Sequence, residues 1–201
     1  MAIRGILWDF GNTLADQDWM LRPSPALPGW EDAWIEIARG PDEANWYRGE
    51  LTSEEIAAQV AGRLGASVEA VLTHMEECCR HISYFPVSLS TAELCPLPRA
   101  IVTVNPDLFS RWVVPHGSLA DVFPTIVTSW EEETNDKGTL CRRAIERWEG
   151  PREPSEVLLI DNSEEALESW ARHGGPGYHY RGGQVLESDL GGELRELLVT
   201  P

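Results

Sequence analysis

The chain has 201 residues, of which 42% are hydrophobic and 24% are charged, a composition typical of a globular protein with a sizeable core. Acidic residues outnumber basic residues by 33 to 16, so the formal net charge is −17. This charge argues against nucleic acid and anionic membranes as partners, because phosphate contacts need clustered Lys and Arg. A small phosphorylated substrate remains compatible, since one positive side chain and a divalent cation can reverse the field inside a pocket.

The sequence contains no stretch of the roughly 20 apolar residues that a membrane span requires. Its N-terminus lacks the charged lead and small-residue cleavage pattern of a secretion signal. We therefore expect a cytoplasmic protein. Its cysteines have no CxxC spacing, and two of them are adjacent, which disfavours a zinc site or a disulfide scaffold. We expect reduced, structural thiols at all four positions: Cys78, Cys79, Cys95 and Cys141.

The first expected strand ends on a carboxylate. Apolar residues 6–8 lead into Asp9, and a turn containing Gly11, Asn12 and Thr13 follows. Glycine allows the neighbouring backbone to approach a ligand closely. Because ligands bind outside the carboxyl ends of parallel strands, Asp9 is a candidate nucleophile.

Residues 16–87 are expected to form a helical insertion without strands. The stretch 19–34 contains three prolines and is expected to be largely irregular before a helix can start. A capping box at 52–55 predicts a helix that Gly65 ends. Ser67 is the expected N-cap of a second helix.

From about residue 88 onward, strand and helix patterns alternate. Apolar runs predict buried strands at 100–104, 125–128 and 157–160. Amphipathic spacing predicts helices over 140–148 and 166–171. The fold class is therefore α/β, with a Rossmann-like parallel-sheet core and helices on both faces. The core is assigned to residues 1–15 and 88–201, and the helical insertion occupies 16–87.

Polar groups follow three of these strands, and a lysine precedes a core helix. Four motifs result, in chain order: Asp9-Phe10-Gly11-Asn12-Thr13, Val102-Thr103-Val104-Asn105, Lys137, and Leu158-Leu159-Ile160-Asp161-Asn162. In residue type and order they resemble the motifs of the haloacid dehalogenase-like (HAD) superfamily of hydrolases. The resemblance spans essentially the whole chain. The helical insertion lies where one branch of that superfamily carries a mobile cap.

This resemblance implies a Mg²⁺-dependent phosphatase acting on a small phosphorylated metabolite. Asp9 would attack phosphorus and form an aspartyl phosphate. The expected Mg²⁺ ligands are an Asp9 oxygen, the main-chain carbonyl of Gly11 and the Asp161 carboxylate. Lys137 would balance their charge. Phosphate binding is expected at Asn12, Thr13 and Asn105, with free N–H groups of the first turn contributing.

The helical insertion is expected to set specificity. Cap closure would exclude water and select substrates by size. Four tryptophans of the insertion are hypothesised to line a cleft between it and the core: Trp19, Trp30, Trp34 and Trp46.

The sequence also departs from the motifs it resembles. Gly11 replaces the second aspartate that phosphatases of the superfamily use as general acid and base, a contribution of about 10²–10⁴-fold. Asp16 or a cap side chain is a candidate replacement. Val104 replaces a phosphate-binding Ser or Thr, and strand alternation predicts that Thr103 faces the opposite way. Asn162 replaces a frequent second aspartate and is expected to cap the following helix.

Two alternatives remain open. In a metal-free 2-haloacid dehalogenase, Asp9 would displace halide from carbon. Such relatives favour an aromatic residue at the position of Gly11 and a cation in the cap, for which Arg22 or Arg80 is available. A catalytically silent member would bind a phosphorylated ligand or a protein partner, and Gly11 and Val104 favour this alternative.

Overall fold

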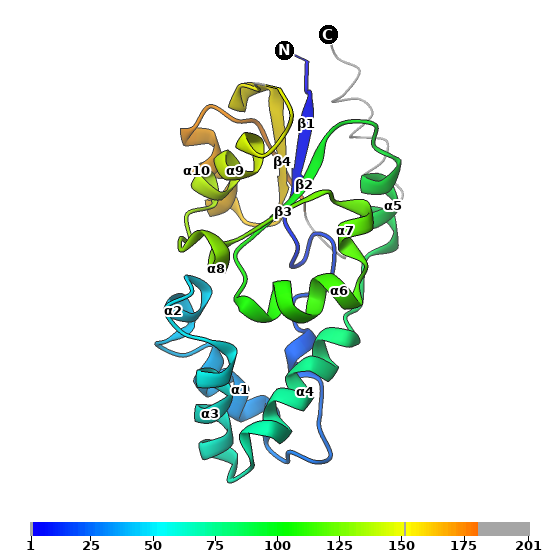
Figure 1. The fold of residues 1–201 in the computed structure, drawn as a ribbon. Helices are drawn as coiled ribbons and strands as arrows, with labels where there is room; N and C mark the ends of the chain where they lie inside the picture. The colour runs from blue at the N-terminus through cyan, green and yellow to red at the C-terminus, as the bar shows by residue number, and fades with distance from the viewer. Residues whose placement is uncertain (1, 151, 181–201) are drawn as a thin grey trace.

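A computed structural model describes residues 2–150 and 152–180 of the chain. They contain one parallel sheet of five strands in the order β3-β2-β1-β4-β5 (Figure 1). The strands are β1 (Gly5–Trp8), β2 (Arg99–Thr103), β3 (Thr125–Thr128), β4 (Val157–Asp161) and β5 (Gly177–His179). The α/β class and the parallel sheet expected from the sequence are confirmed.

The three central strands end at the same edge of the sheet, with β2 and β4 extending slightly beyond the end of β1. Trp8 at the end of β1 pairs with Ile101 of β2 and with Ile160 of β4. All four residues of β1 and all five of β4 are buried, as expected for strands covered on both faces. The segments that follow these strands therefore meet at the same edge of the sheet.

Helices cover both faces of the sheet, as Figure 1 shows. On one face α9 (Lys137–Glu146) and α10 (Glu164–Arg172) pack against apolar side chains of alternate strand positions, including Leu7, Val102 and Leu159. The opposite face carries the other alternate positions, including Trp8 and Ile160. On that side lie α5 (Pro86–Leu94) and α7 (Leu119–Val122).

Several short elements complete the core. A π-helical turn (Phe109–Val113) and α6 (Val114–His116) follow β2, α8 (Ser129–Glu132) follows β3, and the 3-10 turn η3 (Pro154–Glu156) precedes β4. Single π-helical turns frequently occur beside functional sites.

The helical insertion contains the 3-10 turn η1 (Trp19–Leu21), α1 (Trp30–Ala38), α2 (Glu43–Tyr47), α3 (Ser53–Leu64) and α4 (Val68–Arg80). The capping box at Thr52, the left-handed Gly65 and the Ser67 cap are all present, so both predicted helices are confirmed.

The prediction that residues 19–34 are largely irregular is wrong from Trp30 onward. Gly29, in a left-handed conformation, is the N-cap of α1, and Glu31 and Asp32 occupy its first turn. Acidic side chains are favourable there because the N-terminal end of a helix is positive. The three prolines all precede the helix and do not interrupt it.

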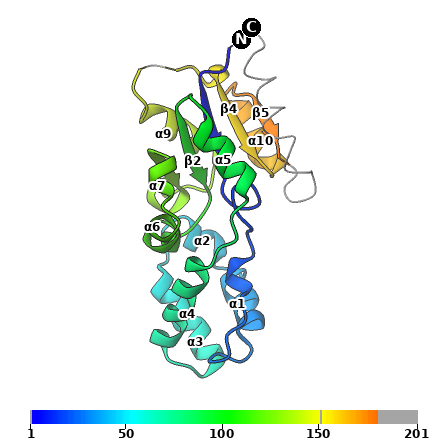
Figure 2. The same ribbon diagram turned by 90° about the vertical axis from the view of Figure 1, so that its right-hand side faces the viewer.

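The chain enters and leaves the helical insertion through two adjacent segments. Asp16 donates its N–H to the carbonyl of Ser83, and Phe85 donates to Leu14. Ala15 and Tyr84 form an isolated antiparallel bridge. Helix α5, which contains the predicted boundary at residue 87, lies beside the sheet in Figure 2.

Two expectations from the sequence, on membrane spans and on the cysteines, can be compared with the described residues. No helix among residues 2–150 and 152–180 has the length and apolar character needed to cross a membrane. Each of the four cysteines is a free, buried thiol.

Candidate active site

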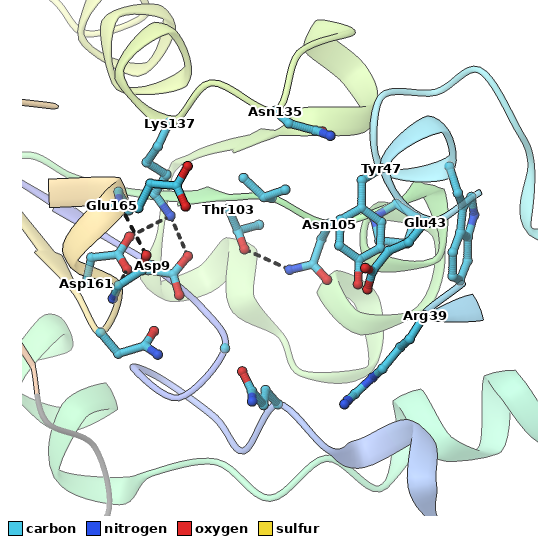
Figure 3. Close-up of a pocket in the computed structure, with 18 of the residues that line it drawn as sticks. Asp9, Arg39, Glu43, Tyr47, Thr103, Asn105, Asn135, Lys137, Asp161 and Glu165 are labelled. Atoms are coloured by element: carbon cyan, nitrogen blue, oxygen red, sulfur yellow. Dashed lines mark hydrogen bonds and ion pairs between the residues drawn. The ribbon is translucent and has the colours of Figure 1, made fainter. Parts of the chain in front are cut away.

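Asp9, Lys137 and Asp161 form one buried charge cluster at the carboxyl edge of the sheet (Figure 3). The Lys137 Nζ atom lies 2.5 Å from Asp9 Oδ1 and 2.8 Å from Asp161 Oδ2. Asp9 follows β1 and Asp161 ends β4, the strand beside it. Because both carboxylates contact the same ammonium group, they are close enough to bind one cation.

Burial and charge act against each other in this cluster. Burial raises the pKa of Asp9 from 3.8 to about 6, Lys137 opposes that rise, and the Asp161 carboxylate adds to it. For Lys137, burial favours the neutral amine, but the two carboxylates outweigh it and raise its pKa. The ammonium is therefore charged at neutral pH.

The position of Lys137 is set by the start of α9. Asp136 is the N-cap, and its Oδ2 accepts hydrogen bonds from the N–H and the hydroxyl of Thr139. Gly138 donates its N–H to Ser169 Oγ of α10, and the Ser169 hydroxyl donates to Asp136 Oδ1. A Cβ at Gly138 would lie 2.8 Å from the Ser169 carbonyl oxygen, so this close approach requires glycine. Lys137, expected just upstream of the helix, is its first residue.

Asn105 lies at the same edge of the sheet and is held from two sides. It donates its backbone N–H to Ser129 Oγ and its side-chain amide to Thr103 Oγ1, at 2.9 and 2.7 Å. Thr103 therefore faces the site, and the prediction that it faces away is wrong. Residues 103 and 105 are two positions apart on an extended chain and share a side. Val104 also lines the cleft.

The turn after Asp9 is only partly directed toward the cleft. Gly11 lines the cleft, whereas Asn12 and Thr13 are not among the lining residues. Asn12 adopts a φ of 55° and donates its N–H to Ala15 O, and Thr13 donates its N–H to Phe10 O. The Thr13 side chain is fully buried. The expected phosphate contacts of Asn12 and Thr13 thus remain a prediction, and their N–H groups already have intramolecular acceptors.

The segment after Asp161 corrects another expectation. The N-cap of α10 is Ser163, whose side chain accepts the N–H of Ala166, so Asn162 is not the cap. Asp161 Oδ1 accepts the N–H of Ser163. Strand β4 extends through Asp161, which shifts the helix start by one residue.

A cleft of about 590 Å³ lies between this edge of the sheet and the helical insertion. Trp19, Trp34 and Trp46 line it, as hypothesised, but Trp30 does not. Asp16 is exposed, binds the N–H of Asp18 and does not line the cleft.

Sequence reasoning missed the polar side chains on the far wall of the cleft. Figure 3 shows Arg39, Glu43 and Tyr47 across the cleft from Asp9 and Lys137. Burial and the neighbouring Glu43 raise the pKa of Tyr47, which keeps its hydroxyl protonated. Glu43 and Tyr47 are one helical turn apart on α2, a spacing visible in the sequence. Asn135 and Glu165 also line the cleft.

The donor set fits Mg²⁺. The cluster offers two carboxylates, and Gly11, which lines the same cleft, carries a main-chain carbonyl; both kinds of group are hard oxygen donors. Asp161 Oδ2 is buried and accepts no well-aligned hydrogen bond, although it is ion-paired with Lys137. Among the described residues, no group of three or more His, Cys, Asp or Glu side chains could hold a metal. An ion bound here would therefore need the Gly11 carbonyl, water or substrate oxygens.

The sequence matches no family model and no curated protein. Solved structures do match. A predicted HAD-like family hydrolase from Porphyromonas gingivalis aligns over 100% of both chains, with a TM-score of 0.75 and 15% identity. The L-2-haloacid dehalogenase of Xanthobacter autotrophicus, with chloropropionic acid covalently bound, covers 99% of this chain and 85% of its own, with a TM-score of 0.66 and 19% identity.

A third match is a HAD family enzyme from Bacteroides thetaiotaomicron in complex with magnesium and inorganic phosphate. It covers 94% of this chain and 100% of its own, with a TM-score of 0.67 and 16% identity. Each of the three matches includes both the sheet and the helical insertion, because it covers 94–100% of this chain. The protein therefore has the fold of the haloacid dehalogenase-like hydrolases, with a helical cap inserted after the first core strand.

Proposed function

We propose that this protein is a Mg²⁺-dependent phosphatase of a small phosphorylated metabolite. The observation that carries the proposal is the buried Asp9–Lys137–Asp161 cluster beside Gly11. Its two carboxylates surround a single ammonium group, and the Asp161 Oδ2 atom has no well-aligned donor. A divalent cation would supply the missing positive charge and would polarise the phosphoryl oxygens of the substrate.

Asp9 is the nucleophile of the proposed reaction. One of its carboxylate oxygens forms a bond to phosphorus while the bond from phosphorus to the ester oxygen breaks, which gives an aspartyl phosphate and an alkoxide. Water then cleaves the aspartyl phosphate and regenerates Asp9 with release of phosphate. Lys137 holds the attacking carboxylate in place and offsets charge on the phosphoryl oxygens, and Asn105 binds one of those oxygens.

Protonation of the leaving group is the weak step of this site. Gly11 has no acidic side chain, and Asp16 lies outside the cleft, which leaves, of the two expected replacements, a side chain of the insertion such as Glu43, on the wall opposite Asp9, as the candidate proton donor. The activity is therefore greatest toward esters whose leaving group needs no proton, such as aryl phosphates. The bound metabolite is expected in the cleft between the sheet and the helical insertion, as a small molecule rather than nucleic acid or a lipid surface.

The test is hydrolysis of para-nitrophenyl phosphate by the full chain, with Mg²⁺ and with EDTA. We expect turnover that depends on Mg²⁺ and is lost in Asp9→Asn. Persistence of turnover in that variant would refute the role of Asp9. Asp16→Asn is the matched control, because this neighbouring carboxylate lies outside the cleft and its replacement should leave turnover unchanged.

A second candidate is a metal-free 2-haloacid dehalogenase, and one observation favours it. Arg39 of the helical insertion lines the cleft on the wall opposite Asp9, although its guanidinium is also ion-paired with Asp18 at 2.7 Å. Arg22 and Arg80, the cations considered from the sequence, do not line this cleft, and Arg80 is paired with Glu76. In this reaction Asp9 would displace halide from carbon, and Arg39 would bind the departing anion.

The two candidates differ in their need for metal. Chloride release from 2-chloropropionate in EDTA, lost in Arg39→Ala, would select the dehalogenase over the phosphatase. If neither substrate is turned over and Mg²⁺ produces no thermal shift, both enzymatic candidates fail and the silent, ligand-binding alternative replaces them.

A further inference from the structure

Asp107 is a buried carboxylate of the core whose hydrogen-bond donors come from the helical insertion. Its Oδ1 accepts the indole N–H of Trp46 at 3.0 Å and the hydroxyl of Ser53 at 2.6 Å. Its Oδ2 accepts the backbone N–H of Ser53 at 3.1 Å. Asp107 is 9% exposed, Trp46 2% and Ser53 0%. Each interaction therefore joins the core to the insertion out of contact with water.

The backbone bond to Ser53 has a specific role in the insertion. Ser53 is the first residue of α3, and the first N–H groups of a helix have no partner within the helix. The N-cap residue Thr52 accepts the N–H of Glu55 and leaves that of Ser53 free. Asp107 supplies the missing acceptor and places negative charge at the positive end of the helix. Helix α3 is thus capped from within and also from the core.

Asp107 is also close to the candidate active site along the chain. It follows Asn105 by two residues, with the rigid Pro106 between them. On the other side, Asn105 exchanges hydrogen bonds with Ser129, accepting the serine hydroxyl at its carbonyl oxygen. The segment 105–107 is consequently fixed at one end to Ser129, the first residue of α8, and at the other end to the helical insertion.

Buried apolar side chains also pack between the two units, but the other side-chain polar contacts between them are more exposed. The ion pair of Arg111 with Glu54 lies on the surface, with both side chains about half exposed. Exposed pairs of this kind contribute little to stability because water screens them. The amide of Asn135 donates to the carbonyl oxygen of Ala44 in α2, also at an exposed position. The Asp107 contacts are the buried part of this set.

We propose that Asp107 is a positioning residue that fastens the helical insertion to the core and couples its placement to that of Asn105. Trp46, held by Asp107, forms part of the cleft wall, while Asn105 faces the cleft from the sheet. Release of this contact frees α2 and the start of α3 and loosens the Asn105 segment at the same time. The structural role proposed for Asp107 does not depend on the reaction, whereas the effect on turnover rests on the proposed phosphatase function.

The structural test is hydrogen–deuterium exchange on the full chain. Asp107→Ala is expected to speed amide exchange over residues 43–56 while α4 and α9 keep their wild-type rates. Ser53→Ala, which removes a hydroxyl donor but leaves the carboxylate in place, should give a smaller change at the same residues. A uniform increase over the whole chain, or no change over 43–56, would overturn the proposal.

Two control variants separate this contact from general effects. Arg111→Ala removes the exposed ion pair between the same two units and should leave exchange over 43–56 unchanged. Ser88→Ala removes another fully buried serine hydroxyl, which donates to Tyr180 and not to the core carboxylate. If either control reproduces the Asp107→Ala pattern, the effect is not specific to Asp107.

The kinetic test uses para-nitrophenyl phosphate. Because Asp107 acts through Asn105, Asp107→Ala should raise KM about tenfold, the size of one lost hydrogen bond, with kcat changed much less. Asp107→Asn retains one acceptor oxygen and should recover part of the loss. Equal falls in kcat and kcat/KM would contradict a positioning role. If the wild-type chain does not hydrolyse the ester, the proposed function fails while the exchange experiment still decides the role of Asp107.

Discussion

The Nζ atom of Lys137 lies 2.5 Å from Oδ1 of Asp9, although 128 residues separate the two in sequence. Asp161 contacts the same ammonium at 2.8 Å. All three side chains are nearly inaccessible to water, so each charge depends on the others for stabilisation. The cluster therefore links the candidate chemistry of the site to the stability of the fold.

Lys137→Met should destabilise the protein strongly. The substitution leaves two adjacent buried carboxylates without a cation, and breaking a buried ion pair in this way costs about 3–5 kcal/mol. Urea denaturation in EDTA measures the change in the free energy of unfolding. Adding Asp9→Asn to the same chain should recover much of the loss, because one of the two uncompensated charges is removed. If Lys137→Met alone were as stable as the wild type, the result would contradict the observed pairing.

Asp9→Asn should stabilise the metal-free protein at neutral pH. The folded state raises the pKa of Asp9 from 3.8 to about 6, so folding disfavours the charged carboxylate. Below pH 3.8 the side chain is neutral in both states, and above pH 6 the folded protein carries the full cost of ionisation. The advantage of the variant therefore grows between these values, to on the order of 1–3 kcal/mol. Thermal melts in EDTA at pH 4 and pH 7.5 compare the wild type with Asp9→Asn. A stability advantage of the variant that shrinks as pH rises would contradict the prediction.

Asp136→Ala should weaken both α9 and the site. Its side chain caps the helix whose first residue is Lys137, and loss of such a cap costs about 1 kcal/mol. Hydrogen bonds from Thr139 hold the pKa of Asp136 below its usual 3.8. The stabilisation by the ionised Asp136 is thus complete above pH 3.8, and it is lost as the pH falls through the lower pKa of the folded state. Denaturation at pH 7 and at pH 3 should show a smaller wild-type-to-variant difference at the lower pH, and Asp136→Asn, which can still cap, should remain near the wild type.

Most of the fold could be predicted from local sequence patterns, because the capping residues and apolar runs specify the same elements that the tertiary structure contains. The capping box at Thr52 and the glycine at 65 fix the ends of α3 through local hydrogen bonds and backbone conformation. Buried apolar runs likewise predicted β1, β2, β3 and β4. Helix α1 was missed in part because three prolines precede it, although proline is unfavourable only inside a helix.

The site was predictable on the sheet side and much less so on the insertion side. Strand ends of a parallel sheet converge by topology, which is why Asp9, Asn105 and Asp161 could be grouped from sequence. Asp107 and Arg39 could not, since their contacts depend on how the helical insertion docks. The strand and turn pattern around Asp107 contains no local signal for a partner at Ser53, 54 residues away.

Gly11→Asp should increase hydrolysis of esters with poor leaving groups. The substitution introduces a carboxyl group into the wall of the cleft at the position where related phosphatases carry their general acid. A Cβ at residue 11 would lie 3.3 Å from Gln17 Cβ and meets no backbone atom within 4 Å, so a small side chain fits if Gln17 shifts by a few tenths of an ångström. A positioned general acid typically contributes about 10²–10⁴-fold.

The comparison requires two substrates and a matched variant. Rates with para-nitrophenyl phosphate, whose leaving group needs no proton, should change little, whereas rates with an alkyl phosphate such as glycerol phosphate should rise. Gly11→Asn adds a side chain of nearly the same size without an acid and should not raise the alkyl rate. An equal response of the two substrates to Gly11→Asp would show that the missing proton donor does not limit this site. A selective rise would identify the absent carboxyl group as the factor that limits hydrolysis of alkyl esters and would place the scissile oxygen beside residue 11.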